Sequence, residues 1–202
     1  MARYTGPRTR ISRRFGVPIF GASKYLDRRN FPPGVHGPKF RRKFSDYAVG
    51  LGEKQKLRYF YGLMERQFRN VYEKALRMRG VTGEKMLQIL ETRLDSIVFH
   101  AGFGLTRAQA RQFIAHGHVK VNGRKVAVPS FAVKVNDAVE VRDHNISKQQ
   151  ANKSLEGSTS RVVPDWVSVD KEHLKAKLLR VPSRDEINPI ANEQAVVEFY
   201  SR

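Results

Sequence analysis

Hydrophobic residues between positions 57 and 78 recur at alternating steps of four and three, the spacing that places side chains on one side of a helix. The members of this stripe are Leu57, Tyr61, Met64, Phe68, Val71, Ala75 and Met78. Gly80 and Gly83 then interrupt the pattern, and a second amphipathic run covers residues 87–101. We therefore predict a helix or a pair of helices from about Ser45, followed by another helical segment.

Residues 106–117 carry the start and stop signals of a short helix. Thr106 and Gln109 form a capping-box pair, and Gly117 suits the left-handed turn that ends many helices. Arg107 and Arg111 lie four residues apart, so we expect them to share the outer face of this helix near the N–H groups of its first turn.

Alternating hydrophobic positions after this helix predict antiparallel strands. The expected strand pairs are 119–121 with 124–126, joined by Asn122-Gly123, and 133–135 with 139–141, joined by Asn136-Asp137. In the first strand, Lys120 should point away from Val119 and Val121 because successive side chains alternate between the two faces of a sheet.

The remaining chain combines several patterns. Residues 166–169 and 178–181 are strand-like, residues 182–186 resemble a helix start, and residues 195–200 are expected to form a final strand or extended run. The polar residues 148–160 show no periodicity, so we expect a loop or an irregular helix there.

These elements predict an α+β protein with a basic extended N-terminal tail, an all-helical domain, and a small domain of helices on an antiparallel sheet. The C-terminal segment is expected to pack back onto this core. The expected divisions are residues 1–44 for the tail, 45–93 for the helical domain completed by 183–202, 94–160 for the small domain, and 161–182 for strands extending its sheet.

The sequence has 38 Lys and Arg against 19 Asp and Glu, a formal net charge of +19. This surplus favours a polyanionic partner, either nucleic acid or an anionic membrane surface. No run of about 18 apolar residues could span a bilayer, and no apolar signal-peptide core follows Met1. We therefore expect a cytoplasmic protein that binds nucleic acid and not a membrane.

The surplus is concentrated in residues 1–44, which contain 12 basic residues and one acidic residue, whereas residues 161–202 contain seven of each. Five prolines and five glycines break regular helix in this first segment. Aromatic residues are interleaved with the cations, a combination that neutralises phosphates and stacks on the unpaired bases of irregular RNA. The alternative interpretation is a solvated basic tail with incidental aromatic residues.

The absence of Cys excludes disulfides, thiolate metal sites and Cys nucleophiles. Among the His residues only His116 and His118 are close, with no carboxylate or further His nearby in sequence, so we expect no metal and no cofactor. Asp95, Asp137 and Asp165 are interpreted as local capping or turn residues. Without a Gly-rich phosphate loop or an activated nucleophile, we expect neither an enzyme nor a small-molecule substrate.

The candidate RNA-binding residues are cations and histidines of the tail, the predicted helices and the first hairpin. They are Arg3, Arg8, Arg10, Arg13, Arg14, Lys24, Arg28, Arg29, His36, Lys39, Arg41, Arg42, Lys43, Lys54, Lys56, Arg58, Arg66, Arg69, Arg107, Arg111, His116, His118, Lys120, Arg124 and Lys125. We expect Arg107→Ala with Arg111→Ala to weaken RNA binding without unfolding the protein. Deletion of residues 1–44 is expected to lower affinity and preserve the fold.

Residues 94–141 resemble the small RNA-binding domain named after ribosomal protein S4. This domain also occurs in pseudouridine synthases, tyrosyl-tRNA synthetases and heat-shock RNA-binding proteins. The motifs outside the domain therefore decide which of these families the chain resembles. These are SRRFG at 12–16, PIFG at 18–21, RNFPPG at 29–34, HG at 36–37, SDY at 45–47, EKQK at 53–56, ERQFR at 65–69 and VEFYSR at 197–202. They are similar to the bacterial S4 family of small-subunit ribosomal proteins, in its cysteine-free and zinc-independent form, over essentially the whole chain.

This resemblance implies a structural constituent of the small ribosomal subunit, which binds the rRNA of that subunit early in assembly and organises a multi-helix junction. It further implies contact with the neighbouring small-subunit ribosomal protein five, a location where messenger RNA enters, an influence on translational accuracy, and repression of its own operon's translation.

The sequence departs from the family pattern at four positions. Gly50 and Gly52 replace polar or basic residues and are expected to loosen the start of their helix. His100 replaces a basic residue, which puts a phosphate contact there in doubt or makes it pH-dependent. Asn136 replaces a Gly, whose left-handed conformation an Asn can mimic.

Two alternatives to a ribosomal protein are an RNA-modifying enzyme that uses the small domain for targeting, and a free RNA chaperone or heat-shock binder. The enzyme would need a further catalytic domain, whereas the segment after the basic domain, residues 142–202, is short for one. The chaperone would have no use for the long N-terminal segment and the helices after it.

Overall fold

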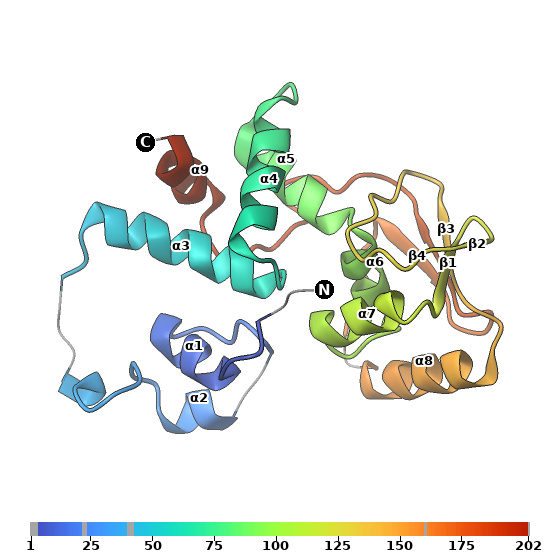
Figure 1. Cartoon of the computed structure of the whole chain (residues 1–202), viewed down its shortest axis with the longest axis horizontal. Coiled ribbons are helices and arrows are strands. Elements are labelled where there is room, and N and C mark those ends of the chain that lie inside the picture. Colours follow the sequence, from blue (N-terminus) through green and yellow to red (C-terminus); the bar gives the residue numbers. More distant parts are fainter. Residues whose placement is uncertain (1–3, 22–23, 40–42, 160, 202) are drawn as a thin grey trace. The chain divides into compact units, whose positions relative to one another are not determined.

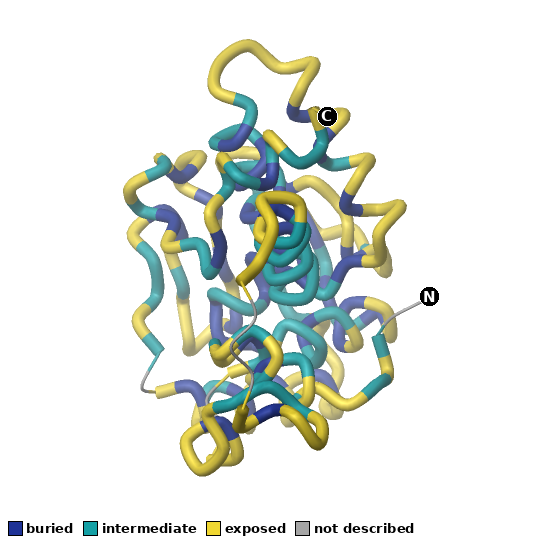
Figure 2. The backbone as a smooth tube through the Cα atoms, turned by 90° about the vertical axis from the view of Figure 1, so that its left-hand side faces the viewer, coloured by how far each residue is buried: buried dark blue, intermediate teal, exposed yellow. Residues whose placement is uncertain are grey.

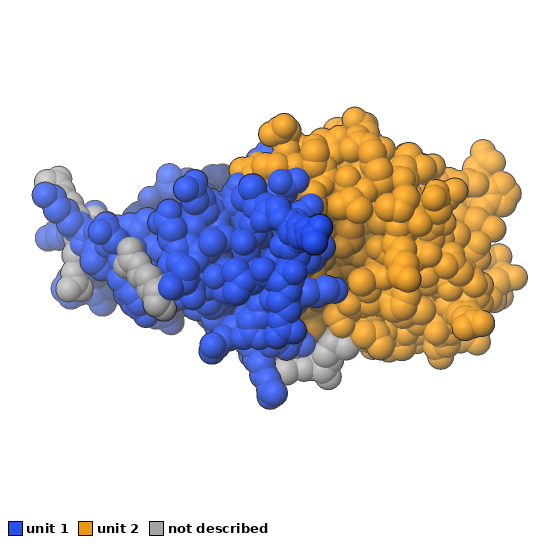
Figure 3. Space-filling view, turned by 90° about the horizontal axis from the view of Figure 1, so that it is seen from above, with its two compact units in different colours: residues 1–87, 188–202 blue, residues 88–187 orange. Residues whose placement is uncertain are grey.

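The computed structural model describes residues 4–21, 24–39, 43–159 and 161–201. The chain divides into two compact units, which Figure 3 shows in different colours. The helical unit comprises residues 1–87 and 188–202, and the sheet unit comprises residues 88–187. Helices and an antiparallel sheet occur together, so the predicted α+β class is confirmed.

The helical unit combines short N-terminal helices, longer central helices and the C-terminal helix (Figure 1). Their bounds are α1 (Arg8–Phe15), α2 (Lys24–Arg28), the 3-10 helix η1 (Gly37–Lys39), α3 (Asp46–Phe60), α4 (Glu65–Leu76), α5 (Thr82–Glu91) and α9 (Glu193–Ser201). The boundary between the units falls inside α5, after residue 87. α1 and α2 lie in the segment that we predicted to be an extended tail, and they are short because proline and glycine recur there.

The predicted hydrophobic stripe is divided between α3, α4 and the turns that follow them. Its buried members are Leu57, Tyr61, Phe68 and Ala75. Met64 and Met78 are exposed, so the prediction of core positions for these two residues is wrong. Met64 is the N-cap of α4 and Met78 follows its C-cap, and at both places the chain leaves the helical spacing.

α9 takes the place of the strand or extended run predicted for residues 195–200, so that prediction is wrong. The side-chain oxygen of Asn192 starts the helix by accepting hydrogen bonds from the N–H groups two and three residues later, at 2.9 and 3.3 Å. α9 packs along α3, where a Cβ added at Gly50 would lie 3.4 Å from Cβ of Phe199. α3 is continuous through Gly50 and Gly52, and the loosening expected of these two glycines stays a prediction.

A buried lysine joins three helices of this unit. Lys54 on α3 is buried, and its Nζ lies 2.7 Å from Oε1 of Glu65 on α4. Tyr200 on α9 donates a hydrogen bond to the same oxygen at 2.9 Å. Burial opposes ionisation of Glu65, but the hydrogen bonds from Lys54 and Tyr200 outweigh it and lower the pKa of Glu65. Lys54, a candidate RNA contact, is therefore turned into the core.

Aromatic side chains of the N-terminal segment pack onto α3. The ring centroid of Tyr59 lies 5.1 Å from that of Tyr4 and 6.2 Å from that of Phe20. Ile19 is buried. Deletion of residues 1–44 would uncover these apolar surfaces, so we no longer expect the fold to be unaffected by it.

The sheet unit packs helices against an antiparallel sheet (Figure 1). Its elements are α6 (Leu94–His100), α7 (Arg107–Ala115), β1 (Val119–Val121), β2 (Arg124–Lys125), β3 (Ala138–Val141), α8 (Asn145–Gly157), β4 (Val167–Asp170) and β5 (Lys175–Leu178). Among the described residues the sheet has five strands in the order β2-β1-β3-β5-β4. The C-terminal strands therefore extend the sheet that the first hairpin begins.

The first predicted hairpin is confirmed and the second is wrong. Asn122 and Gly123 join β1 to β2 with φ of 49° and 77°, the positive values that this turn requires. Residues 133–135 form no strand, because β3 pairs with β1 on one side and β5 on the other. Asn136 has φ of 72°, so its expected left-handed conformation is confirmed.

The C-terminal part of the sheet unit differs from prediction in detail. β5 runs from Lys175 to Leu178, so each of its ends lies three residues before the corresponding end of the predicted strand 178–181. The Glu186 carboxylate accepts the Ser183 N–H at 2.9 Å, as in a capping box, and also pairs with Arg180. Only a turn at residues 184–186 follows, so the predicted helix does not form there. α8 is a 13-residue helix, where we predicted a loop or an irregular helix.

One hydrophobic core lies between the helices and the sheet of this unit. Its members include Leu94, Ile97, Phe113, Ile114, Val119, Val121, Val139 and Leu178. Figure 2 marks the buried positions along the backbone. Val119 and Val121 face this core and Lys120 is less buried, as the strand alternation predicts.

Replacing Glu65 by Ala should leave the Lys54 ammonium buried without its carboxylate. We expect the free energy of unfolding to fall by about 2–3 kcal/mol. Lys54→Met should cost less, because Glu65 is half exposed and can turn to water. Chemical denaturation monitored by circular dichroism measures both variants.

The difference between wild type and Glu65→Ala should be present above the ordinary pKa of a Glu and shrink as pH falls through the lowered pKa of Glu65. Equal stability of wild type and Glu65→Ala at neutral pH would contradict the role given to this carboxylate.

Candidate RNA-binding surface

Arginines around α6 and α7 are held against buried carboxylates. Asp95 accepts hydrogen bonds from Nε and Nη2 of Arg93 at 2.9 and 2.6 Å, and both side chains are buried. Nη1 of Arg111 lies 3.8 Å from the same carboxylate. Burial lowers the pKa of Arg111, against the opposing effect of Asp95, but an arginine remains charged.

Glu91, at the end of α5, holds a second arginine. Its Oε1 accepts a hydrogen bond from Nη2 of Arg107 at 3.2 Å, and its Oε2 lies 2.6 Å from Nε2 of His100. Arg107 also donates to Oγ of Ser96 at 2.8 Å. The side chains of Glu91 and Arg107 are only 5% and 12% exposed. His100 therefore has a carboxylate partner inside the protein.

The expectation that Arg107 and Arg111 share an exposed outer face is wrong. They do share a face of α7, but α7 packs against α6 and that face meets Glu91 and Asp95. The interpretation of Asp95 as a capping residue is also wrong, because its carboxylate pairs with arginines. The predicted start of α7 is confirmed, since Oγ1 of Thr106 accepts the N–H three residues later at 3.1 Å.

A row of charged side chains crosses the sheet from one edge to the other. The antiparallel registers place in this row Lys125 on β2, Lys120 on β1, Glu140 on β3, Lys175 on β5 and Asp170 on β4. Directly opposed residues share a face of the sheet. Charges alternate from Lys120 to Asp170, but at the β2 edge two lysines stand side by side.

This edge is where positive charge is least compensated by neighbouring strands. Like charges directly opposite one another destabilise a strand pair, and an anion between them relieves the repulsion. Arg124, Lys125 and His116 are exposed near the hairpin, and Lys120 is half-buried. Of the candidates in the sheet unit, these four residues therefore remain candidates for contact with RNA phosphates.

His118 lies among further cations next to the hairpin. Its ring stacks on Phe113 with centroids 4.9 Å apart, and its Nδ1 lies 2.9 Å from Oγ of Ser147. Burial lowers the pKa of His118, and so do the nearby positive groups, namely His116, His144, Arg142 and Lys125. The positive potential around His118 is one that phosphate would neutralise.

Two members of this group, Arg142 and His144, were missed as candidates. They follow β3, and the pairing of Val119 with Val141 brings the end of β3 beside the start of β1. They lie near the hairpin because β3 pairs with β1. The sequence pattern instead predicted that residues 139–141 pair with 133–135, so this proximity was not predicted.

Most candidates in the helical unit are exposed. They are Arg8, Arg10, Arg14, Lys24, Arg28, Arg29, His36, Lys39, Lys43, Arg66 and Arg69. Exposed cations without close carboxylates are available to phosphates, whereas Arg69 already lies 3.2 Å from Glu73. Arg3, Arg41 and Arg42 lie outside the described residues.

Other candidates in this unit have structural partners. Arg13 donates from Nε to the backbone oxygens of Arg29 and Phe31, at 3.2 Å each. Lys56 pairs with Glu53, and Arg58 donates to Gln55 at 2.8 Å. The sequence motifs alone did not separate these side chains from the exposed ones.

In the part of the chain that the structure describes, no group of His, Asp and Glu is arranged to hold a metal ion. The same residues form no helix that is both long and apolar enough to cross a membrane.

Arg107→Ala should destabilise the sheet unit, because it removes an arginine partner from the buried carboxylate of Glu91. We expect the free energy of unfolding to fall by about 2–3 kcal/mol, measured by chemical denaturation. For the same reason we no longer expect Arg107→Ala with Arg111→Ala to leave the fold unaffected, since both arginines lie beside buried carboxylates.

Arg124→Ala is the matched control, because Arg124 is exposed on the hairpin and should change stability by less than about 0.5 kcal/mol. If the two substitutions proved equally harmless, Arg107 would not be part of the supporting structure.

Comparisons with known proteins match both units. Residues 3–91 match the family described as ribosomal protein S4/S9 N-terminal domain, and residues 92–139 match the S4 domain. Relatives matched over 100% of both chains include small ribosomal subunit protein uS4 of Opitutus terrae, 58% identical over 202 residues, and of Akkermansia muciniphila, 52% identical over 203 residues. The same protein of Chlorobium limicola is 48% identical over 203 residues, again over the full length of both.

These matches confirm the resemblance that the sequence motifs indicated, and the chain has no Cys, as in the zinc-independent form. On this similarity over its whole length, the chain belongs to the bacterial family of small ribosomal subunit protein uS4.

Proposed function

We propose that this chain is a structural component of the small ribosomal subunit and binds the rRNA of that subunit through the exposed cations of both units. The observation that carries the proposal is the pair of opposed lysines, Lys120 and Lys125, beside exposed Arg124 and His116. On its other side Lys120 faces Glu140 of β3, whereas Lys125 lies on the edge strand β2, so a phosphate beside Lys125 would relieve the repulsion between the two lysines.

The second part of the proposal concerns the form of the RNA. Phosphates at a junction of several RNA helices repel one another, and a rigid basic surface lets them approach by neutralising charge. In the sheet unit, the ion pairs of Glu91 and Asp95 and the hydrophobic core supply this rigidity. We therefore propose that the chain organises a multi-helix junction as a primary binder early in assembly.

Further partners follow from membership of the family and form part of the same proposal. They are the neighbouring small-subunit ribosomal protein five and messenger RNA where it enters the subunit. By holding rRNA near that place, the chain would influence translational accuracy. Family membership favours this function over the targeted enzyme and the free RNA chaperone.

Binding to small-subunit rRNA fragments at several salt concentrations tests the proposal. The logarithm of affinity should fall linearly with the logarithm of salt concentration, and binding should survive competition by unrelated RNA. For Arg124→Gln with Lys125→Gln, we expect the slope to decrease by roughly 0.7–0.9 for each phosphate that the variant no longer neutralises.

Lys171→Gln is the control for this measurement, because Lys171 is an exposed cation of the C-terminal segment, where charges balance. It should leave the slope unchanged. Equal affinity for ribosomal and unrelated RNA would exclude the proposed function, and an unchanged slope in the double variant would exclude the hairpin from the binding surface.

A further inference from the structure

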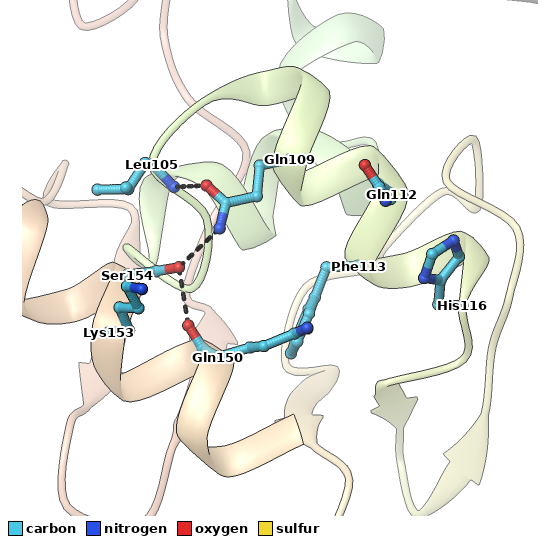
Figure 4. A pocket seen from close by; sticks show the side chains of 8 residues that line it. All are labelled: Leu105, Gln109, Gln112, Phe113, His116, Gln150, Lys153 and Ser154. Carbon is cyan, nitrogen blue, oxygen red and sulfur yellow. Dashed lines mark hydrogen bonds between the residues drawn. The ribbon is translucent and has the colours of Figure 1, made fainter. Parts of the chain in front are cut away.

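A cavity of about 310 Å³ lies between α7 and α8, within the sheet unit (Figure 4). Gln112, Phe113 and His116 line it from the side of α7, and Gln150 and Lys153 line it from α8. This volume falls in the range of sites for small organic ligands, roughly 300–1,000 Å³. None of the sequence motifs pointed to it, because its two helices are separated by three strands.

One wall of the cavity is fixed by hydrogen bonds that Figure 4 shows as dashed lines. Oε1 of Gln109 accepts the N–H of Leu105 at 3.0 Å, and its Nε2 donates to Oγ of Ser154 at 3.1 Å. Ser154 in turn donates to the backbone oxygen of Gln150 at 2.9 Å. These bonds join α7 to α8, so the cavity is formed before any ligand arrives.

The other lining groups remain available to a ligand. The side-chain amides of Gln112 and Gln150 are exposed and make no hydrogen bond within the described part of the chain. Each amide offers two donors and an acceptor. Phe113 is 5% exposed and lines the cavity with the accessible part of its ring, which also stacks with His118.

The charge around the cavity favours an anionic molecule. None of its lining residues is Asp or Glu, and Lys153 and His116 contribute positive or protonatable groups. Gly117, directly after His116, lies against the side chain of Lys125. The cavity therefore borders the hairpin that we propose to contact RNA phosphates.

We propose that this cavity receives one unpaired nucleobase of the bound RNA, which leaves its stack and inserts between α7 and α8. The base packs on Phe113, the amides of Gln112 and Gln150 bond its edge, and Lys153 and His116 meet the adjoining phosphates. RNA-binding proteins commonly recognise unstacked bases through aromatic and amide groups. Adenine is the base expected first, because a glutamine amide can bond the N6 donor and the neighbouring N1 acceptor of its Watson–Crick edge.

This inference rests on the proposed function, and the test uses the full chain bound to small-subunit rRNA. Gln150→Trp fills the cavity, and Gln112→Ala with Gln150→Ala removes the amides without adding volume. Gln149→Ala is the matched control, because Gln149 is exposed on the same helix and does not line the cavity. Circular dichroism and thermal melting establish that each variant folds.

Dimethyl sulfate modifies N1 of unpaired adenines and reports whether a base edge is covered. We expect an adenine that wild type and Gln149→Ala protect to become reactive with both cavity variants. Affinity should fall about tenfold for Gln150→Trp, within the range for loss of one stacked base, and by less for the amide variant, which keeps Phe113. The salt dependence should keep its slope because every phosphate remains neutralised.

An identical modification pattern and affinity for wild type and both cavity variants would overturn the inference and leave the proposed function standing. The same result is expected if the cavity instead receives a side chain of a neighbouring protein. Failure of the wild-type chain to select ribosomal RNA would remove the proposed function, and this inference with it.

Discussion

Both units depend on supplying partners to cations that the fold withdraws from water. A buried ammonium or guanidinium without a partner costs several kcal/mol, so its position fixes where a carboxylate or carbonyl must lie. Lys54 meets Glu65, and Arg93 meets Asp95. Arg161 donates from Nη1 to the backbone oxygen of Phe99 at 2.9 Å. The chain has twice as many cationic as anionic side chains. These pairings therefore decide which cations stabilise the fold and which remain on the surface.

Other cations of the described residues, among them Arg124 and Lys125, face outward, and their arrangement gives the surface its chemistry. In the charge row of the sheet, Glu140 separates Lys120 from Lys175 and thereby leaves the excess charge at the hairpin edge. The carboxylates that pair with buried cations are not available to the cations outside, so the buried ion pairs and the basic surface arise together. A rigid set of outward cations holds RNA phosphates without losing the conformational entropy that a flexible tail would lose.

The features of this fold that nearby residues determine were predicted well. The features that depend on contacts between residues far apart in the sequence were predicted poorly. The helix after Thr106 and the turn at Asn122-Gly123 were predictable because their determinants lie within a few residues. The helix at residues 195–200 combines a local signal, the capping side chain of Asn192, with packing against α3 that the sequence does not show. The inward face of Arg107 depends on Glu91, 16 residues earlier. Arginine spacing shows which side chains share a face but not whether that face meets solvent or a carboxylate.

The most direct test of this division of charge is chemical modification of lysine and arginine side chains, read by mass spectrometry, with and without bound small-subunit rRNA. Lys120, Arg124 and Lys125 should react in the free protein and be protected in the complex, whereas Arg107 and Arg111 should react slowly in both. Rapid modification of Arg107 and Arg111 in the free protein, followed by their protection on RNA binding, would contradict the account.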